Sequence, residues 1–426
     1  MLMASIFIAM LLMICINMPI AVALAMAGVL GLVATEGTGS LVTIALDMYD
    51  GSTKFSLIAI PMFVLAGAIM NAGGITDRLI NFVTAIIGFI RGGLAMVNIG
   101  VSLFFAEISG SAVADVAAMG SILIPQMKKR GYSKEFSAAV TSSSASLAII
   151  IPPSIPMILY AASANTSVEQ LFVAGVVPGL LGAGGLMTVA YLFAKKYDFP
   201  TEAAFNIARL RETFIDALPA FTLPVIILGG IFGGYVTATE AAGLAVLASI
   251  IVSAWYGNLD FSHLRRAMLD GGIQTAVVML LVAASVLMGG FLTRAQIPQQ
   301  LAESILSITS QQWAILLILN FFFLIVGFFL HSAAAIILVI PIVIPLITAA
   351  GIDPVHFGLV VTLNLAIGQQ TPPVASVLIT ACSVARANIW EVSKVNIWFV
   401  GVLLAVLMLC TYVPSVPMFL VEYFYR

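Results

Sequence analysis

Residues 141–161 read TSSSASLAIIIPPSIPMILYA, a mostly apolar stretch that Pro152 and Pro153 interrupt near its centre. Consecutive prolines remove backbone donors and clash with the preceding turn, so they stop or kink a helix. Irregular backbone inside a bilayer is tolerated only where protein or a bound ion satisfies its carbonyl groups. Residues 136–165 therefore predict a broken membrane helix whose hydroxyls and loose carbonyls suit an alkali cation. The simpler interpretation is a kink whose Ser and Thr hydroxyls bond to the preceding turn.

The overall composition is that of a membrane protein. Of 426 residues, 62% are hydrophobic and 8% are charged, and the mean hydropathy is +1.15. Soluble domains carry roughly 25% charged residues, and even a large one leaves about a quarter of its chain surface exposed to water. The net charge of −2 offers no basic surface to a phosphate backbone. The sequence therefore predicts a polytopic protein of the lipid bilayer with no nucleic-acid partner.

Helix-length apolar segments recur along the whole chain. Each is continuously apolar, which favours an all-α bundle over barrel strands, since barrel strands alternate with period two. They predict about ten to twelve spans and two shorter, more polar segments. No Lys or Arg precedes Lys54, so the N-terminus lacks the basic region of a removable signal. Three cysteines lie in apolar runs and are interpreted as small hydrophobic residues: Cys15, Cys382 and Cys410.

A second proline pair, Pro372 and Pro373, follows the first at a distance of 220 residues. The same gapless offset relates four more identical pairs: Pro125 and Pro345, Gly131 and Gly351, Ala161 and Ala381, and Ser163 and Ser383. Residues 357–385 therefore predict a second broken helix. Asn364 and the sequence GQQT at 368–371 supply polar groups before its break. The two broken helices mark an internal repeat.

The charges of two equivalent loops predict that the copies have opposite orientations. The loop at 126–135 carries Lys128, Lys129, Arg130 and Lys134, whereas the loop at 346–356 has no Lys or Arg. Under the positive-inside rule, the first loop is cytoplasmic and the second lies on the opposite side. Inverted repeats with broken helices are typical of secondary transporters.

Two short segments are too polar for comfortable membrane crossings and predict re-entrant helical hairpins at 104–125 and 328–349. The first contains Glu107 and Asp115, and the second begins near His331. Ionisable groups at this depth are candidate functional residues, and a helix N-terminus at a hairpin tip offers backbone N–H groups to an anion. The alternative role for the two carboxylates is to cap a hairpin or pair with a neighbouring helix.

These features predict four regions. Residues 1–72 form N-terminal scaffold helices, and 73–196 form the first repeat with its hairpin and broken helix. Residues 197–272 contain a mixed-charge arm along the membrane, or an ordinary connecting helix, followed by further scaffold helices. Residues 273–426 form the second repeat and the C-terminal helix.

At this point the sequence resembles the large membrane subunit of tripartite ATP-independent periplasmic (TRAP) transporters. The resemblance covers nearly the whole chain, and its most specific stretches are EISGSAVADVAAMGSILIPQMKKRGY (Glu107–Tyr132), IIPPSIPMILYA (Ile150–Ala161) and GQQTPPVASVL (Gly368–Leu378). Among branches of the family, the chain looks most like the sialic-acid type.

This resemblance implies sodium-coupled secondary uptake of an organic acid across the bacterial inner membrane, with Na⁺ as the coupling ion. It implies an elevator motion of a transport domain, containing both hairpins and both broken helices, against a scaffold. The implied partners are a small TRAP membrane subunit and a periplasmic substrate-binding protein. No enzymatic activity is expected.

The resemblance also implies roles for individual residues. One sodium ion is expected at Ser109, Gly110, Ser144 and Ser146. The other is expected at Gly327, Gly368 and Thr371. Substrate contacts are expected at Ser111, Asp115 and Ser154. Many relatives carry Asp where this chain has His331, so a carboxylate from the second hairpin is missing here.

Other functions compete with this interpretation. A sodium–dicarboxylate carrier of similar architecture that works without a binding protein fits the same sequence physics. A remote alternative is an intramembrane serine protease with Ser109 or Ser111 as nucleophile and His331 as base, although the usual Gly-x-Ser-Gly context is missing. An ATP-driven pump is disfavoured because the chain has no G-x-x-x-x-G-K-[ST] loop. A passive channel is a further alternative, but two broken inverted repeats fit an alternating-access transporter better.

Overall fold

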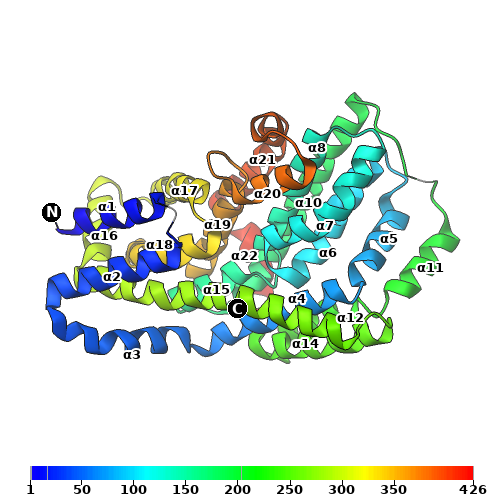
Figure 1. The fold of residues 1–426 in the computed structure, drawn as a ribbon. Helices are drawn as coiled ribbons and strands as arrows, with labels where there is room; N and C mark the ends of the chain where they lie inside the picture. Colours follow the sequence, from blue (N-terminus) through cyan, green and yellow to red (C-terminus); the bar gives the residue numbers. More distant parts are fainter. Residues whose placement is uncertain (1, 17, 203, 426) are drawn as a thin grey trace.

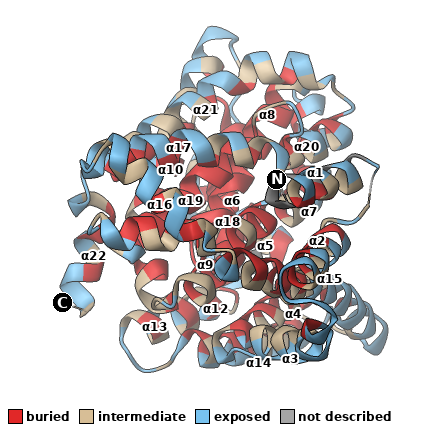
Figure 2. Cartoon of the chain, turned by 90° about the vertical axis from the view of Figure 1, so that its left-hand side faces the viewer, coloured by how far each residue is buried: buried red, intermediate tan, exposed pale blue. Residues whose placement is uncertain are grey.

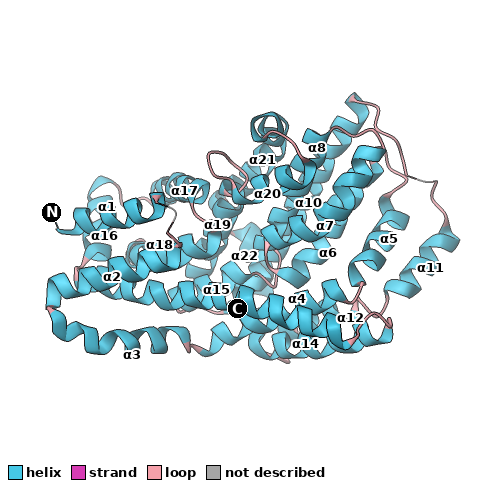
Figure 3. Cartoon of the chain, viewed as in Figure 1, coloured by secondary structure: helices cyan, strands magenta, loops and turns pink. Residues whose placement is uncertain are grey.

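The computed structural model describes residues 2–16, 18–202 and 204–425, and leaves out the side chains of residues 2–4, 11, 15 and 107–109. Every regular element within the described residues is helical (Figure 3). Continuous apolar runs of this length satisfy their backbone groups internally only as helices. The predicted all-α membrane architecture is therefore confirmed.

The first half of the chain runs to the end of a 29-residue helix. Its elements are α1 (Leu2–Cys15), α2 (Ile20–Glu36), η1 (Thr38–Ser40), α3 (Leu41–Ser52), η2 (Phe55–Ile58), α4 (Ala59–Ala72), α5 (Ile75–Ile87), α6 (Gly93–Ser109), α7 (Ala112–Lys129), α8 (Lys134–Ala145), η3 (Ser146–Ile149), α9 (Ile155–Ala164) and α10 (Val168–Lys196) (Figure 1).

A connecting helix, α11 (Ile207–Ala217), packs on α5 and leads into the second half. The remaining elements are α12 (Thr222–Pro224), η4 (Val225–Gly229), α13 (Gly230–Phe232), α14 (Ala238–Trp255), α15 (Phe261–Arg294), α16 (Ile297–Ile308), α17 (Gln312–Phe329), α18 (Ser332–Ala349), α19 (Pro354–Gly368), α20 (Ser376–Ala385), α21 (Ile389–Tyr412) and α22 (Ser415–Tyr425).

At an offset of 220 residues, nearly every helix of the first half has a counterpart in the second half. The repeat therefore extends beyond the predicted ranges 73–196 and 273–426. At this offset α7 superposes on α18 in sequence, α2 on α14, and α3 with α4 on the single long helix α15. Backbone details follow the same offset, since both Pro-Pro bonds are cis and both loop glycines, Gly131 and Gly351, have positive φ. The helices at 1–72 are thus one copy of a unit that recurs from residue 222 onward.

Both predicted broken helices are present. In the first half α8 and η3 are separated from α9 by the Pro152–Pro153 break, within 136–165. In the second half α19 is separated from α20 by the Pro372–Pro373 break, within 357–385. The two copies thus repeat the same helix–break–helix plan.

The hairpins are longer than the predicted 104–125 and 328–349. The first consists of α6 and α7 joined at Gly110, and the second of α17 and α18 joined at Leu330. The apolar run 79–106 is not one helix, because it turns between α5 and α6, where Gly92 has positive φ. The first arm of each hairpin is therefore an apolar helix, α6 or α17, that begins before the predicted range.

The number of long spans is smaller than the expected ten to twelve. Among the described residues, seven helices are long and apolar enough to cross a membrane, or eight if the bent pair of α11 with α12–α13 is one span. The other apolar segments form helices of 10–17 residues, because breaks and glycine turns divide them. Seven candidate spans still make this a multi-pass membrane protein.

The helices form two groups that meet along α15. Helices α2, α3, α4 and α14 pack against one another or against α15, and form the scaffold. The hairpins and broken helices pack together as α6 with α8, α7 with α20, and α17 with α19. Buried residues concentrate around α6, α9, α18 and α19, whereas the outer face of α14 is largely exposed (Figure 2). The hairpins and broken helices are the second group of helices, which we call the core group.

Candidate functional site

A central cavity of about 560 Å³ lies where the core group meets α15. Both hairpin tips and both helix breaks contribute to its wall. The lining residues are Val64, Gly110, Ser111, Ala112, Val113, Ala114, Ala117, Ile149, Ile155, Pro156, Ile273, Gln274, Val277, Val278, His331, Ser332, Ala333, Gln369, Ser376 and Thr380. Residues more than 200 positions apart thus form one enclosure of a size typical of small-molecule sites.

Four helices of the core group begin at this cavity. Ser111 caps α7 and His331 caps α18, while the first residues of α9 and α20, Ile155 and Ser376, also line the wall. The first N–H groups of a helix lack intrahelical partners, and the helix dipole is positive at that end. None of the lining residues, all within the described chain, is Asp, Glu, Lys or Arg. The cavity therefore presents neutral donors that suit an anionic group.

The first predicted ion site is built around Gly110. This residue has φ +58°, and a Cβ placed there would lie 2.8 Å from the Pro153 carbonyl oxygen and 3.2 Å from the Ile155 nitrogen. The hairpin tip therefore touches the first break directly, and η3 packs against both arms. Ser109 ends α6 at the same tip, but its side chain lies outside the described residues. The carbonyls of the break and tip are the hard, neutral ligands that sodium sites use.

Ser144 on α8 and Ser146 on η3 are fully buried and already have hydrogen-bond partners. The Ser144 hydroxyl bonds to Ser102 at 2.9 Å and to Asn98 Oδ1 at 3.1 Å, which ties α8 to α6. The Ser146 hydroxyl donates to the Ser142 carbonyl at 3.1 Å. Both hydroxyls keep acceptor lone pairs, since a hydroxyl has one donor and two acceptor sites.

The second predicted ion site brings two glycine backbones together. A Cβ on Gly368 would lie 2.6 Å from the Gly327 carbonyl carbon, so α17 and the end of α19 are in direct contact. Thr371 follows within the break, and its hydroxyl donates to the Ile367 carbonyl at 3.1 Å. Gly327, Gly368 and Thr371 thus lie close together. The oxygens that they offer to an ion are again backbone carbonyls and a hydroxyl.

The predicted substrate contacts divide into three environments. Ser111 lines the central cavity at the start of α7. Asp115, one turn further on, is buried and lines an adjacent crevice of about 80 Å³. Ser154 is fully buried as the cap of α9: it accepts from Met157 N at 3.4 Å and donates to the Ile149 carbonyl at 2.7 Å. Ser154 therefore positions the start of α9 rather than lining the cavity.

His331 stands at the second hairpin tip, where many relatives were expected to carry Asp. Its side chain accepts a hydrogen bond from Ala333 N at 3.4 Å, and it lines the same cavity as Ser111. It therefore takes the position of an N-cap, a role that Asp also fills well. The second hairpin keeps a capped helix N-terminus without a carboxylate.

Several buried polar residues that link neighbouring helices were not among the predicted site residues. Ser143 bonds to Gln370 Oε1 at 2.7 Å and to Asn396 Oδ1 at 2.8 Å, which joins α8 to the second break and α21. Asn364, the repeat equivalent of Ser144, bonds to Asn320 on α17 at 2.7 Å. Asn98, Asn320 and Asn396 are polar residues inside apolar helices, and that was the available signal.

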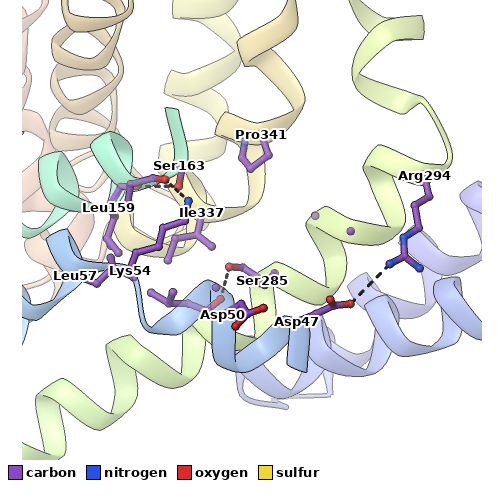
Figure 4. Close-up of a pocket in the computed structure, with 16 residues that line it drawn as sticks. Asp47, Asp50, Lys54, Leu57, Leu159, Ser163, Ser285, Arg294, Ile337 and Pro341 are labelled. Atoms are coloured by element: carbon purple, nitrogen blue, oxygen red, sulfur yellow. Dashed lines mark hydrogen bonds and ion pairs between the residues drawn. The ribbon is translucent and has the colours of Figure 1, made fainter. Parts of the chain in front are cut away.

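A second, charged crevice of about 480 Å³ lies further along α15 (Figure 4). The Lys54 ammonium reaches across it and donates to the Ala162 carbonyl near the C-terminus of α9 at 2.8 Å. Arg294 forms ion pairs with Glu36 and Asp47 on the scaffold side. Lys54 is thus a contact between the scaffold and a half-helix of the core group.

Comparisons with known proteins agree with this arrangement. The sequence model of the family described as "Tripartite ATP-independent periplasmic transporter, DctM component" matches residues 7–416. The uncharacterized protein YgiK of Salmonella typhimurium is 40% identical over 95% of this chain and 94% of its own. The C4-dicarboxylate TRAP transporter large permease protein DctM of Pseudomonas aeruginosa is 37% identical over 89% of each chain. The sialic acid TRAP transporter large permease protein SiaM of Vibrio cholerae is 34% identical over 96% of each chain.

A solved structure shares the fold at low sequence identity. The crystal structure of the YdaH transporter of Alcanivorax borkumensis, described as having an unusual topology, aligns with a TM-score of 0.66 over 89% of each chain at 13% identity. At this identity the likeness concerns the arrangement of helices alone.

Proposed function

Because the chain belongs to the DctM family of TRAP transporters, of which it is a large membrane subunit, we propose that it performs sodium-coupled uptake of an organic acid across the bacterial inner membrane. The observation that carries this proposal is the central cavity between two hairpin tips and two helix breaks. Its neutral N–H donors match a carboxylate, and the carbonyl contacts beside it match alkali cations.

The proposed partners follow from the tripartite family. A small membrane subunit would complete the membrane part, and a periplasmic binding protein would deliver the acid. The relatives differ in the acids their names give, C4-dicarboxylate and sialic acid, at 37% and 34% identity. Identity alone therefore does not choose between these substrates, and both remain candidates.

Sodium would bind at two places where a hairpin meets a broken helix. One is the tip at Gly110 against the first break, together with Ser144 and Ser146 on α8 and η3, which pack against α6. The other is the group of Gly327, Gly368 and Thr371. Each place adjoins a helix that begins at the cavity. Ion binding would thus order the tip that holds the acid, which couples the two ligands.

The proposed motion is an elevator step of the core group against the scaffold. The support for it is the division of the molecule: the site belongs to the core group except for one wall, which α4 and α15 supply. Movement of the core group along that wall would expose the acid first to one side and then to the other.

Uptake into proteoliposomes tests this function. Vesicles containing the chain and its small-subunit partner would receive labelled sialic acid or labelled C4-dicarboxylate, with and without an inward sodium gradient and the binding protein. We expect uptake of one acid that requires both sodium and the binding protein. Sodium-driven uptake without the binding protein would instead support a two-component carrier, and sodium-independent uptake would contradict the coupling.

A further inference from the structure

Three hollows lie in line along α15. The crevice of about 80 Å³ includes Gln274, the central cavity of about 560 Å³ adjoins residues 273–278, and the crevice of about 480 Å³ adjoins residues 282–294. The scaffold helix α15 therefore contributes a wall to each of these three hollows. Side chains on this wall would contact a ligand that the core group holds in the central cavity.

Gln274 is the one residue of α15 that lines both the smaller crevice and the central cavity. It lies within a 34-residue, largely apolar helix, and its side chain is exposed to these hollows. Its amide forms no hydrogen bond with any residue in the described part of the chain. Because it faces the cavity, this amide is available to hydrogen-bond a ligand held there.

The two walls of the central cavity differ in polarity. The core group contributes polar side chains: Ser111, His331, Ser332, Gln369, Ser376 and Thr380. From the scaffold, the described lining residues other than Gln274 are Val64, Ile273, Val277 and Val278, which are all apolar. An acid held by the helix N-termini of the core group would therefore meet one polar scaffold group, the Gln274 amide.

The repeat places a second hydrogen-bond donor at the equivalent position. Lys54 precedes Gln274 by 220 residues. It lines the larger crevice, and its ammonium bonds to the Ala162 carbonyl of the core group (Figure 4). In both halves this position thus directs a donor from the scaffold toward the core group, but only Lys54 finds a protein acceptor there.

We propose that Gln274 is a specificity-determining residue that binds the transported acid from the scaffold side. This inference rests on the proposed function. The amide donates to a carboxylate or accepts from a hydroxyl, since it has two donors and an acceptor. The acid then needs two polar ends, one for the helix N-termini and one for Gln274. The substrate class is a dicarboxylate or a hydroxylated carboxylate, and simple monocarboxylates bind poorly.

The test measures uptake by the complete tripartite system carrying Gln274→Leu, Gln274→Asn or the control Gln300→Leu. Gln300 is an exposed glutamine on α16 outside the three hollows. We expect Gln274→Leu to raise KM for the acid about tenfold, which equals about 1.4 kcal/mol. The sodium concentration for half-maximal uptake should stay unchanged. Gln274→Asn should recover part of the affinity, and Gln300→Leu should match the wild type.

The outcomes separate this inference from the proposed function. Absence of sodium-driven acid uptake by the wild type contradicts the proposed function itself. Wild-type uptake with an unchanged KM in Gln274→Leu overturns the role of Gln274 alone, and so does a change confined to kcat, which indicates a contact of the moving protein rather than of the acid. Wild-type uptake of a monocarboxylate that lacks a second polar group, at the rate of the transported acid, overturns the substrate class.

Discussion

Gly327 and Gly368 illustrate how single residues shape this site. Their backbones touch, and neither position has room for a side chain. Forcing a methyl group into such a contact typically costs 1–3 kcal/mol. We expect Gly368→Ala to lower the free energy of unfolding by about this amount and to reduce sodium-dependent uptake. Gly401→Ala is the control, because a Cβ at that exposed helical position meets nothing within 4 Å. Equal thermal unfolding of the two variants in detergent would contradict the close contact.

The second proposed ion site can be tested at Thr371 with a substitution that keeps the shape of the side chain. Thr371→Val removes the hydroxyl but keeps the volume, and we expect a several-fold rise in the sodium concentration for half-maximal uptake. Thr348→Val is the matched control, since both hydroxyls donate to the carbonyl four residues earlier, at 3.1 Å and 2.9 Å. If both variants keep the sodium dependence of the wild type, Thr371 is not an ion ligand.

The sequence located part of the site at this scale. Candidate residues next to a proline break could be predicted, because the proline pair itself indicates an irregular backbone there. The partners of Ser143 could not, since Gln370 and Asn396 lie 227 and 253 positions away and no local pattern pairs them. The family resemblance predicts a substrate contact at Ser154, and the structure adds that this serine caps α9, a role that the sequence alone does not reveal.

At the scale of helices, the predicted inversion of the repeats can be tested with equivalent residues. Lys129 ends α7 and Ala349 ends α18, and both are exposed. In a chain with its native cysteines replaced, we expect Ala349→Cys to react with a membrane-impermeant maleimide added to spheroplasts. Lys129→Cys should react only after the cells are opened. Reaction of both cysteines from one side would show that the repeats are parallel.

Some helix boundaries could be predicted from sequence patterns and others could not. Pro-Pro breaks and the 220-residue offset predicted both broken helices correctly, because proline stops a helix whatever its surroundings. The turn between α5 and α6 was missed, since glycines in an apolar run are compatible with a continuous membrane helix. The same limit hid the equivalence of α3 and α4 to α15: one half bends at residues 53–58 and the other continues as a single helix.

For the whole molecule, the proposed division into a moving core group and a fixed scaffold can be tested by cross-linking. Lys54→Cys with Ser163→Cys joins the scaffold to α9 across the charged crevice, where Lys54 already bonds to the adjacent Ala162 carbonyl. We expect a short bifunctional maleimide on this pair to stop uptake. The control pair, Lys128→Cys with Arg386→Cys, joins two helices of the core group, where Lys128 bonds to the Ala385 carbonyl at 3.2 Å.

Uptake should survive the control cross-link, because α7 and α20 move together in an elevator step. Loss of uptake in both pairs, or in neither, would contradict the division proposed for the chain. The extent of cross-linking is measured in the same vesicles by peptide mass analysis, so that an unreacted sample is not scored as an active one.

The correspondence of the two halves also bears on the energy of the empty carrier. If the halves exchange roles during the step, the inward- and outward-facing states contain the same kinds of helix contacts. Their free energies then differ through the bend at residues 53–58, which α15 lacks, and through positions where the copies carry different residues, such as Lys54 and Gln274. Because about 1.4 kcal/mol changes a population ratio tenfold, a few such differences decide which side the unloaded protein faces at rest. The direction of net flux would come from the ion gradient, not from the protein.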